Sequence, residues 1–291
     1  MISLAEASFI LLGLAIAAVW WPVACRFGTL AVPAWSLIFI GACASALAAG
    51  IVNFPALGGL GLLALACLAS QRQERGVAFA ASWLAGILAL LLALHAWPGF
   101  RALPIVEGWQ ASPDARPFTL RAGFDKATAG LFLLAFFARR VESRRELGQL
   151  IARILPLTAL IVLTTLGGAW LSGFVRPDFK WPDFGWQFIA INLLFTCIAE
   201  ETFFRSLIQE KLHRLCTARP WARPLPILLP ALLFSAVHLS GGLLYASLAG
   251  LAGLGYALIY ARTRRIEAAV IAHFSVNLVH FTGFTYPGLA H

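Results

Sequence analysis

The sequence predicts an all-α fold, a polytopic transmembrane helical bundle of about ten helices, and three observations support this prediction. The chain of 291 residues is 60% hydrophobic and only 12% charged, whereas a soluble domain is nearer a quarter charged. Its mean hydropathy is +0.82. Its apolar residues also gather in runs of the length that a helix needs to cross a bilayer, which is about 20 residues.

Ten apolar runs give the predicted helices, and charged residues, Pro or Gly separate them. In chain order the runs are 7–24, 30–52, 56–70, 77–97, 125–138, 151–172, 186–207, 225–240, 243–261 and 266–284. The runs 56–70 and 125–138 are short for a straight span. An eight-helix bundle, in which these two segments are re-entrant, is therefore the alternative.

The basic residues predict the orientation of the bundle. Fifteen of the 22 Lys and Arg residues fall in alternate short loops, and six fall in the other loops. Basic loops face the cytoplasm, so both termini are predicted outside. The net charge of +9 is thus explained by topology, and a nucleic-acid partner is excluded. The outside segments 98–124 and 173–185 are rich in Pro, Gly and aromatic residues, which predicts ordered loops at the interface.

The basic loop 139–150 predicts a division of the chain. Residues 1–150 form an N-terminal transmembrane region of unknown role, because its helices are ordinary apolar segments. Residues 151–291 form the predicted catalytic core, because the polar residues of interest lie there.

Three ionisable residues interrupt the run 186–207. Glu200, Glu201 and Arg205 lie in the second half of an expected membrane helix, where charge is costly. Glu201 and Arg205 are spaced i, i+4, so we expect a supporting ion pair. Glu200 points about 100° away and has no local partner, so it is expected to face a polar cavity or to be protonated. The alternative is a helix end that meets the cytosol.

Two later runs carry imidazole and amide groups. His238 follows Phe234 by one helical turn, and His273 and Asn277 are spaced i, i+4. His280 lies two turns after His273 on nearly the same face. Taken singly, such residues are more often hydrogen-bonded packing residues. Their clustering in the last third of the chain favours one polar active site.

This set of residues suits the hydrolysis of an amide by water. A glutamate and a histidine can together hold and deprotonate a water molecule, and a second histidine and an asparagine amide can donate hydrogen bonds to an oxyanion. No cofactor is expected on this reading. The alternative is a divalent metal such as Zn, held by Glu200, His238 and His273, although the spacing is not HExxH.

The same residues carry a family pattern. The motifs EExxxR at 200–205, FxxxH at 234–238 and HxxxN at 273–277 occur in this order on predicted membrane helices. The chain from about 190 to 282 resembles the CPBP family of glutamic-type intramembrane proteases, named for CAAX processing and bacteriocin self-immunity. One departure is Ser206, where a Gly often follows the motif Arg.

The resemblance implies an intramembrane endopeptidase that cleaves a membrane-anchored or lipid-modified protein or peptide. It implies Glu200 as the general base, His238 as its helper, and His273 with Asn277 as the oxyanion site. We expect an integral membrane protein of a bacterial inner (plasma) membrane, whose partners are the lipid bilayer and a peptide substrate. The alternatives are a non-catalytic immunity or partner-binding protein, and a transporter that uses Glu200 as a proton or cation site.

Overall fold

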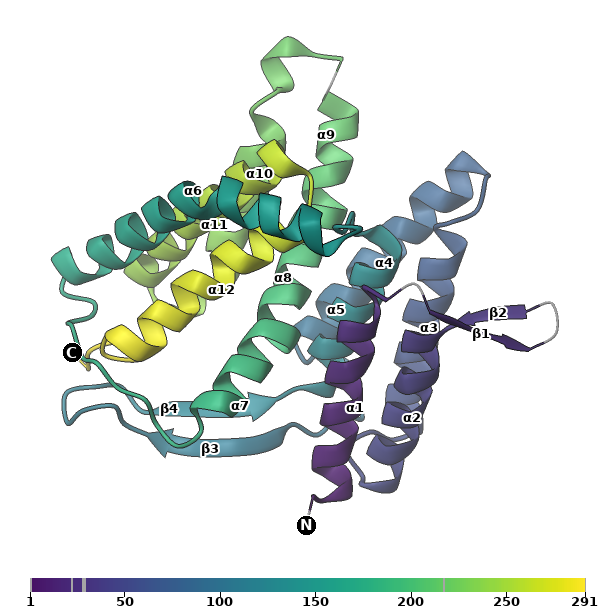
Figure 1. Cartoon of the computed structure of the whole chain (residues 1–291), viewed down its shortest axis with the longest axis horizontal. Coiled ribbons are helices and arrows are strands. Elements are labelled where there is room, and N and C mark those ends of the chain that lie inside the picture. The colour runs from purple at the N-terminus through teal and green to yellow at the C-terminus, as the bar shows by residue number, and fades with distance from the viewer. Residues whose placement is uncertain (1, 22, 28–29, 217, 291) are drawn as a thin grey trace. The chain divides into compact units, whose positions relative to one another are not determined.

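The computed structural model describes residues 2–290 except 22, 28, 29 and 217. It confirms the predicted all-α helical membrane bundle (Figure 1). Ten helices are present among the described residues when the continuous helix 185–216, which alternates α- and π-helical segments, is counted once. Both short apolar runs, 56–70 and 125–138, form helices, of 16 and 14 residues, and whether they cross the membrane or are re-entrant stays a prediction.

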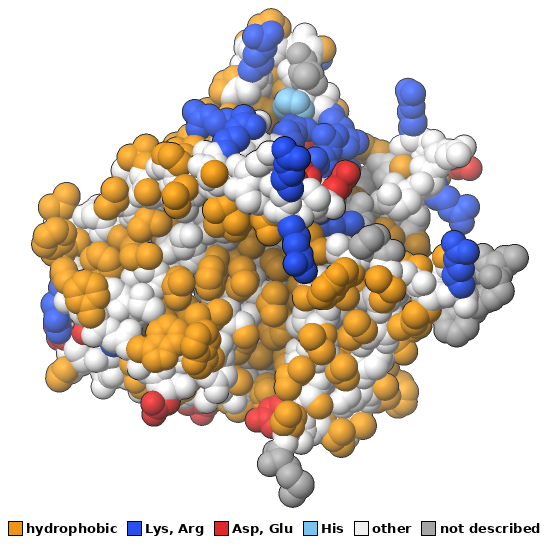
Figure 2. Space-filling model, in the orientation of Figure 1, with side chains coloured by type: hydrophobic (Ala, Val, Ile, Leu, Met, Phe, Trp, Pro, Cys, Tyr) orange, Lys and Arg blue, Asp and Glu red, His pale blue; other side chains and the backbone are white. Residues whose placement is uncertain are grey.

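Five helices of the described chain are long and apolar enough to cross a membrane. They are Arg75–Ala93, Arg144–Leu171, Gly185–Cys216, Pro220–Val237 and Leu243–Thr263. Apolar side chains cover much of the face shown in Figure 2. Many large ones are exposed, including Leu163 and Leu171 on one helix and Leu232 on another. Such a surface is stable against lipid rather than water. The predicted outside position of both termini stays a prediction.

The chain packs into two compact units that interleave along the sequence. The first comprises Met1–Ile105, Arg121–Ala138 and Leu193–Phe203, and the second comprises Val106–Leu120, Arg139–Asn192 and Phe204–His291. These units therefore do not follow chain order. The predicted functional division at residue 150 is a separate matter and stays a prediction.

The first unit is built around one short central helix. Its elements are α1 (Leu4–Ala18), β1 (Ala24–Phe27), β2 (Leu30–Pro33), α2 (Ala34–Ala48), α3 (Phe54–Ala69), α4 (Arg75–Ala93), α5 (Phe124–Phe137) and α8 (Ile198–Glu201). Helix α5 packs against α1, α3, α4 and α8. Its residues from Ala127 to Leu134 are all buried, which is the pattern of a helix enclosed by others.

One predicted helix of this unit begins later than expected. The run 30–52 was expected to be helical throughout, but residues Leu30–Pro33 form β2, which pairs antiparallel with β1. Helix α2 starts directly after Pro33. Proline has no N–H to donate, and its fixed φ suits a helix start, so the apolar pattern alone misplaced this boundary.

The second unit contains the remaining helices. They are α6 (Arg144–Leu171), α7 (Gly185–Ala190), α9 (Glu210–Cys216), α10 (Leu225–Val237), α11 (Leu243–Thr263) and α12 (Ile266–Gly283). Helix α11 packs against α6, α10 and α12, and α12 also packs against α6. Helix α6 begins seven residues before the predicted run 151–172, because Ser143 accepts a hydrogen bond from the Glu146 N–H at 3.1 Å and so caps the helix.

The helix that carries the two glutamates is irregular. It runs from Gly185 to Cys216 without a break, but residues Ile191–Cys197 and Thr202–Gln209 are π-helical. These segments flank α8, which holds Glu200 and Glu201. The uniform α-helical spacing expected from sequence is therefore wrong here. π-Helical turns are rare, and they occur frequently at functional sites.

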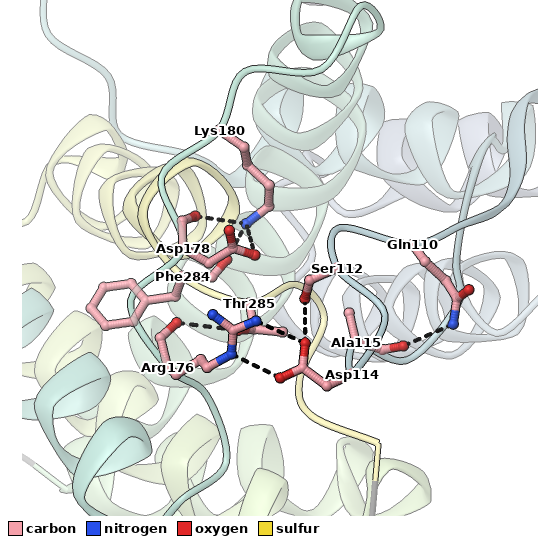
Figure 3. A network of polar contacts seen from close by, with 9 residues as sticks. All are labelled: Gln110, Ser112, Asp114, Ala115, Arg176, Asp178, Lys180, Phe284 and Thr285. Atoms are coloured by element: carbon pink, nitrogen blue, oxygen red, sulfur yellow. Dashed lines mark hydrogen bonds and ion pairs between the residues drawn. The ribbon is translucent and has the colours of Figure 1, made fainter.

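The segments 98–124 and 173–185, predicted to lie outside, are ordered. The first contains two strands that pair, β3 (Leu103–Trp109) and β4 (Phe118–Ala122). In the second unit, polar contacts tie these segments to the chain after α12 (Figure 3). Arg176 donates two hydrogen bonds to the Asp114 carboxylate, both 2.8 Å long. The Lys180 ammonium donates to the Phe284 carbonyl. The two predicted loops are thus joined to each other and to the chain after α12 by hydrogen bonds.

Candidate active site

The two adjacent carboxylates differ in burial. Glu201 is fully buried, whereas Glu200 is partly buried. Both lie in the single α-helical turn between the π-helical segments. Glu200 is the sixteenth residue of the 32-residue helix 185–216, so it lies far from both ends of a candidate membrane helix, where a lone charge is costly.

Glu200 has a cationic partner that the sequence reasoning missed. The Lys126 Nζ atom donates to Glu200 Oε1 at 2.6 Å, and the two side chains are 24% and 17% exposed. The expectation that no partner neutralises Glu200 is therefore wrong. The partner lies 74 residues away in sequence, so local spacing cannot reveal it. The one signal was the pair of charges, Asp125 and Lys126, at the start of a short apolar run.

A close helix contact brings these two side chains together. Gly130, one turn after Lys126 on α5, lies against Ala199, the residue before Glu200. A Cβ atom on Gly130 would lie only 2.8 Å from the Ala199 Cα atom. Only glycine allows the two backbones to approach so closely. The contact therefore fixes the register of α5 on α8.

Arg205 belongs to the second unit and is fully buried. Its guanidinium carbon lies 5.8 Å from the ring centroids of both Phe204 and Phe234, which is cation–π distance. The predicted ion pair of Glu201 with Arg205 stays a prediction. The aromatic contacts show a further way in which a membrane helix accommodates this guanidinium.

His238 ends helix α10 in a defined tautomer. Its Nδ1 atom lies 2.6 Å from the Phe234 carbonyl oxygen. A carbonyl only accepts, so Nδ1 carries the proton, and in the tautomer with one proton Nε2 is the acceptor. The chain then makes a short 3₁₀ turn, and Gly242 has a φ of +99°, a conformation that side-chain-bearing residues rarely adopt. This turn holds His238 at the end of the helix.

His273 and Asn277 lie on α12, as predicted. The His273 ring stacks on Tyr256 at a centroid distance of 4.8 Å. Asn277 donates from Nδ2 to the Asn192 side-chain oxygen at 3.2 Å, so Asn192 orients this amide. Asn192 lies within the apolar run 186–207, and no local pattern in the sequence links residues that are 85 positions apart.

One pocket of the second unit collects these groups. Its cavity volume is about 80 Å³, and it lies among α6, α10, α11 and α12. Its polar lining includes His238, His273, Asn277 and His280. A concave, largely apolar lining with a few convergent polar groups is typical of a ligand site. The structure thus brings together the three predicted site residues of this unit, and it adds His280.

The alternative of a metal site depends on whether enough ligands converge. The described part of the chain contains no group of three or more His, Cys, Asp or Glu side chains arranged to hold a metal ion. The pocket itself offers imidazole and amide groups but no carboxylate. The expectation of a site without a cofactor remains a proposal that experiment must decide.

Comparison with protein families assigns part of the chain. A family model described as Type II CAAX prenyl endopeptidase Rce1-like matches residues 181–279. This segment is similar to an Rce1-like domain. It covers about a third of the chain and contains all three sequence motifs, which confirms the predicted resemblance. Searches of curated proteins and of solved structures gave no match.

The Rce1-like domain sets the general class of the protein. It supports an intramembrane endopeptidase of the CAAX type, and together with the five apolar helices it supports an integral membrane protein. Lys126 lies outside the matched residues, although it contacts Glu200, which lies inside them.

Proposed function

We propose that this protein hydrolyses a peptide bond of a membrane-anchored or lipid-modified protein or peptide, within a bacterial inner membrane. The observation that carries the proposal is the pocket lined by His238, His273 and Asn277 inside an Rce1-like domain. These are the groups that direct attack of water requires besides a base. We assign the base to Glu200, from the glutamate motif of the same domain.

The chemistry follows from the roles of these groups. Glu200 takes a proton from water, His238 holds that water through Nε2, and the oxygen attacks the carbonyl carbon of the substrate. His273 and Asn277 donate hydrogen bonds to the oxyanion that forms. Glu200 then returns the proton to the leaving nitrogen, and the C–N bond breaks. No nucleophilic side chain and no covalent intermediate are needed.

Further support comes from the packing around the motifs. Phe204, four residues after Glu200 in the same helix, packs against Phe234 with a centroid distance of 5.2 Å. Phe234 also contacts the rings of His238 and His273, at 4.6 and 5.6 Å. Phe234 thus lies between the His238 and His273 rings and contacts both.

The test is cleavage of a quenched-fluorescent farnesylated peptide by the purified protein in nanodiscs. Glu200→Gln is expected to lower kcat by about 10²–10⁴-fold, the usual contribution of a general base. Glu142→Gln, at an exposed carboxylate, is the matched control and should cleave normally. If Glu200→Gln retained the wild-type rate, the assignment of the base would be wrong.

The same assay decides whether a metal takes part. We propose a metal-free reaction, so protein shown by elemental analysis to lack bound metal should keep full activity after chelator treatment. Loss of activity that Zn²⁺ restores would instead support a metal held by Glu200, His238 and His273.

A further inference from the structure

The proposed role of Glu200 requires an ionised carboxylate, and the residues of the family motif do not explain how its charge is stabilised. To act as a base it must be ionised, yet it lies at the middle of a 32-residue apolar helix. A carboxylate in such a place is costly and tends to take up a proton unless a cation lies close by. Something in the chain must therefore offset its charge and hold its orientation.

The structure provides this group from outside the family-matched region. We propose that Lys126 is a positioning residue that keeps Glu200 ionised and oriented for proton transfer from water. The inference rests on the proposed function. The Lys126 Nζ atom lies 2.6 Å from Glu200 Oε1, the length of a charge-assisted hydrogen bond. Lys126 binds Oε1, and we assign the proton transfer to Oε2.

The position of Lys126 is fixed by its own surroundings. Asp125, the preceding residue, is 2% exposed, and it contacts the His95 ring at 2.7 Å and accepts from the Lys126 backbone N–H at 2.8 Å. These contacts anchor the first turn of α5. One turn later, the Gly130–Ala199 contact fixes the same helix on α8. The backbone of Lys126 is thus held in place by the contacts of Asp125 before it and of Gly130 after it.

This arrangement gives the N-terminal region a role. The first unit packs the whole of α5 between α1, α3, α4 and α8, and the start of α5 carries the cation. The helices before the Rce1-like domain therefore build the support for a catalytic side chain that lies inside that domain. An isolated fragment 181–279 would lack this cation.

The test compares Lys126→Met and Lys126→Arg with wild-type protein on the same farnesylated probe. Lys126→Met keeps the length of the side chain but removes its charge. It is expected to lower kcat by about 10²-fold while KM changes less than about threefold, because the pocket that binds substrate is intact. Lys126→Arg, which keeps the charge, is expected to recover at least a tenth of the wild-type kcat. Lys211→Met, at a cation on α9, is the matched control.

Three outcomes would overturn the inference, two of them seen with the single variants and one in a double-mutant cycle. One is a wild-type kcat for Lys126→Met. The second is an equal loss in the Met and Arg variants together with lower thermal stability in both, which indicates a structural role only. A thermal double-mutant cycle with Lys126→Met and Glu200→Gln measures the ion pair without catalysis, and additive effects would also overturn the inference. If the Glu200→Gln variant still cleaved the probe, the proposed function would be wrong. The thermal double-mutant cycle would still measure whether Lys126 and Glu200 form an ion pair.

Discussion

The contact between Gly130 and Ala199 gives the sharpest structural prediction. A Cβ atom on Gly130 would lie 2.8 Å from Ala199 Cα, 2.9 Å from its Cβ and 3.1 Å from its nitrogen, whereas ordinary contact begins at 3.4 Å. The obstacle is largely backbone and cannot rotate away. In Gly130→Ala, helices α5 and α8 must therefore separate by about 0.6 Å, a shift of the kind that overpacked interiors show.

The expected cost follows from that separation. Overpacking costs about 1–3 kcal/mol, whereas replacing Gly by Ala inside a helix gains up to about 1 kcal/mol. A Cβ atom added to Gly61, on α3 of the same unit, would meet no atom within 4 Å, so Gly61→Ala reports the gain alone. The stability difference between the two variants is then the packing cost, about 1–3 kcal/mol.

The assay is thermal unfolding of the purified protein in detergent, followed by tryptophan fluorescence. Gly130→Ala should melt several degrees below Gly61→Ala, and it should also cleave the farnesylated probe more slowly, because Lys126 moves away from Glu200. If Gly130→Ala were as stable as Gly61→Ala, the close contact of α5 with α8 would be wrong.

Two further predictions concern the second unit. Hydrogen bonds from Arg176 hold the pKa of Asp114 well below its usual range. The pair therefore stabilises the folded protein fully above about pH 4, and this contribution is lost as the pH falls through the lowered pKa. The melting-temperature gap between wild type and Asp114→Asn should therefore be clear at pH 6 and shrink below pH 4, and a gap that did not depend on pH would contradict this. Asn192→Ala removes the hydrogen-bond acceptor of Asn277, so kcat should fall by up to about tenfold, the value of one hydrogen bond, with KM retained; an unchanged kcat would show that the orientation of the amide does not matter.

The sequence by itself determined the class of fold and most members of the candidate site. Apolar runs fix membrane helices because a bilayer imposes one length and one polarity on each. The motifs at 200–205, 234–238 and 273–277 were visible because helical spacing links residues that are close in sequence. In the structure His238, His273 and Asn277 line one pocket.

Only the tertiary structure decided which distant side chains meet. Lys126 reaches Glu200 across 74 residues, and Asn192 orients Asn277 across 85. Neither contact follows from local periodicity, because it depends on how closely helices approach, as at Gly130 on Ala199. The π-helical turns around the glutamates also escaped prediction, since the apolar pattern records burial and not the number of residues in each turn. The sequence thus shows that a charged residue such as Glu200 lies in an apolar helix, whereas helix packing determines that its ion-pair partner is Lys126.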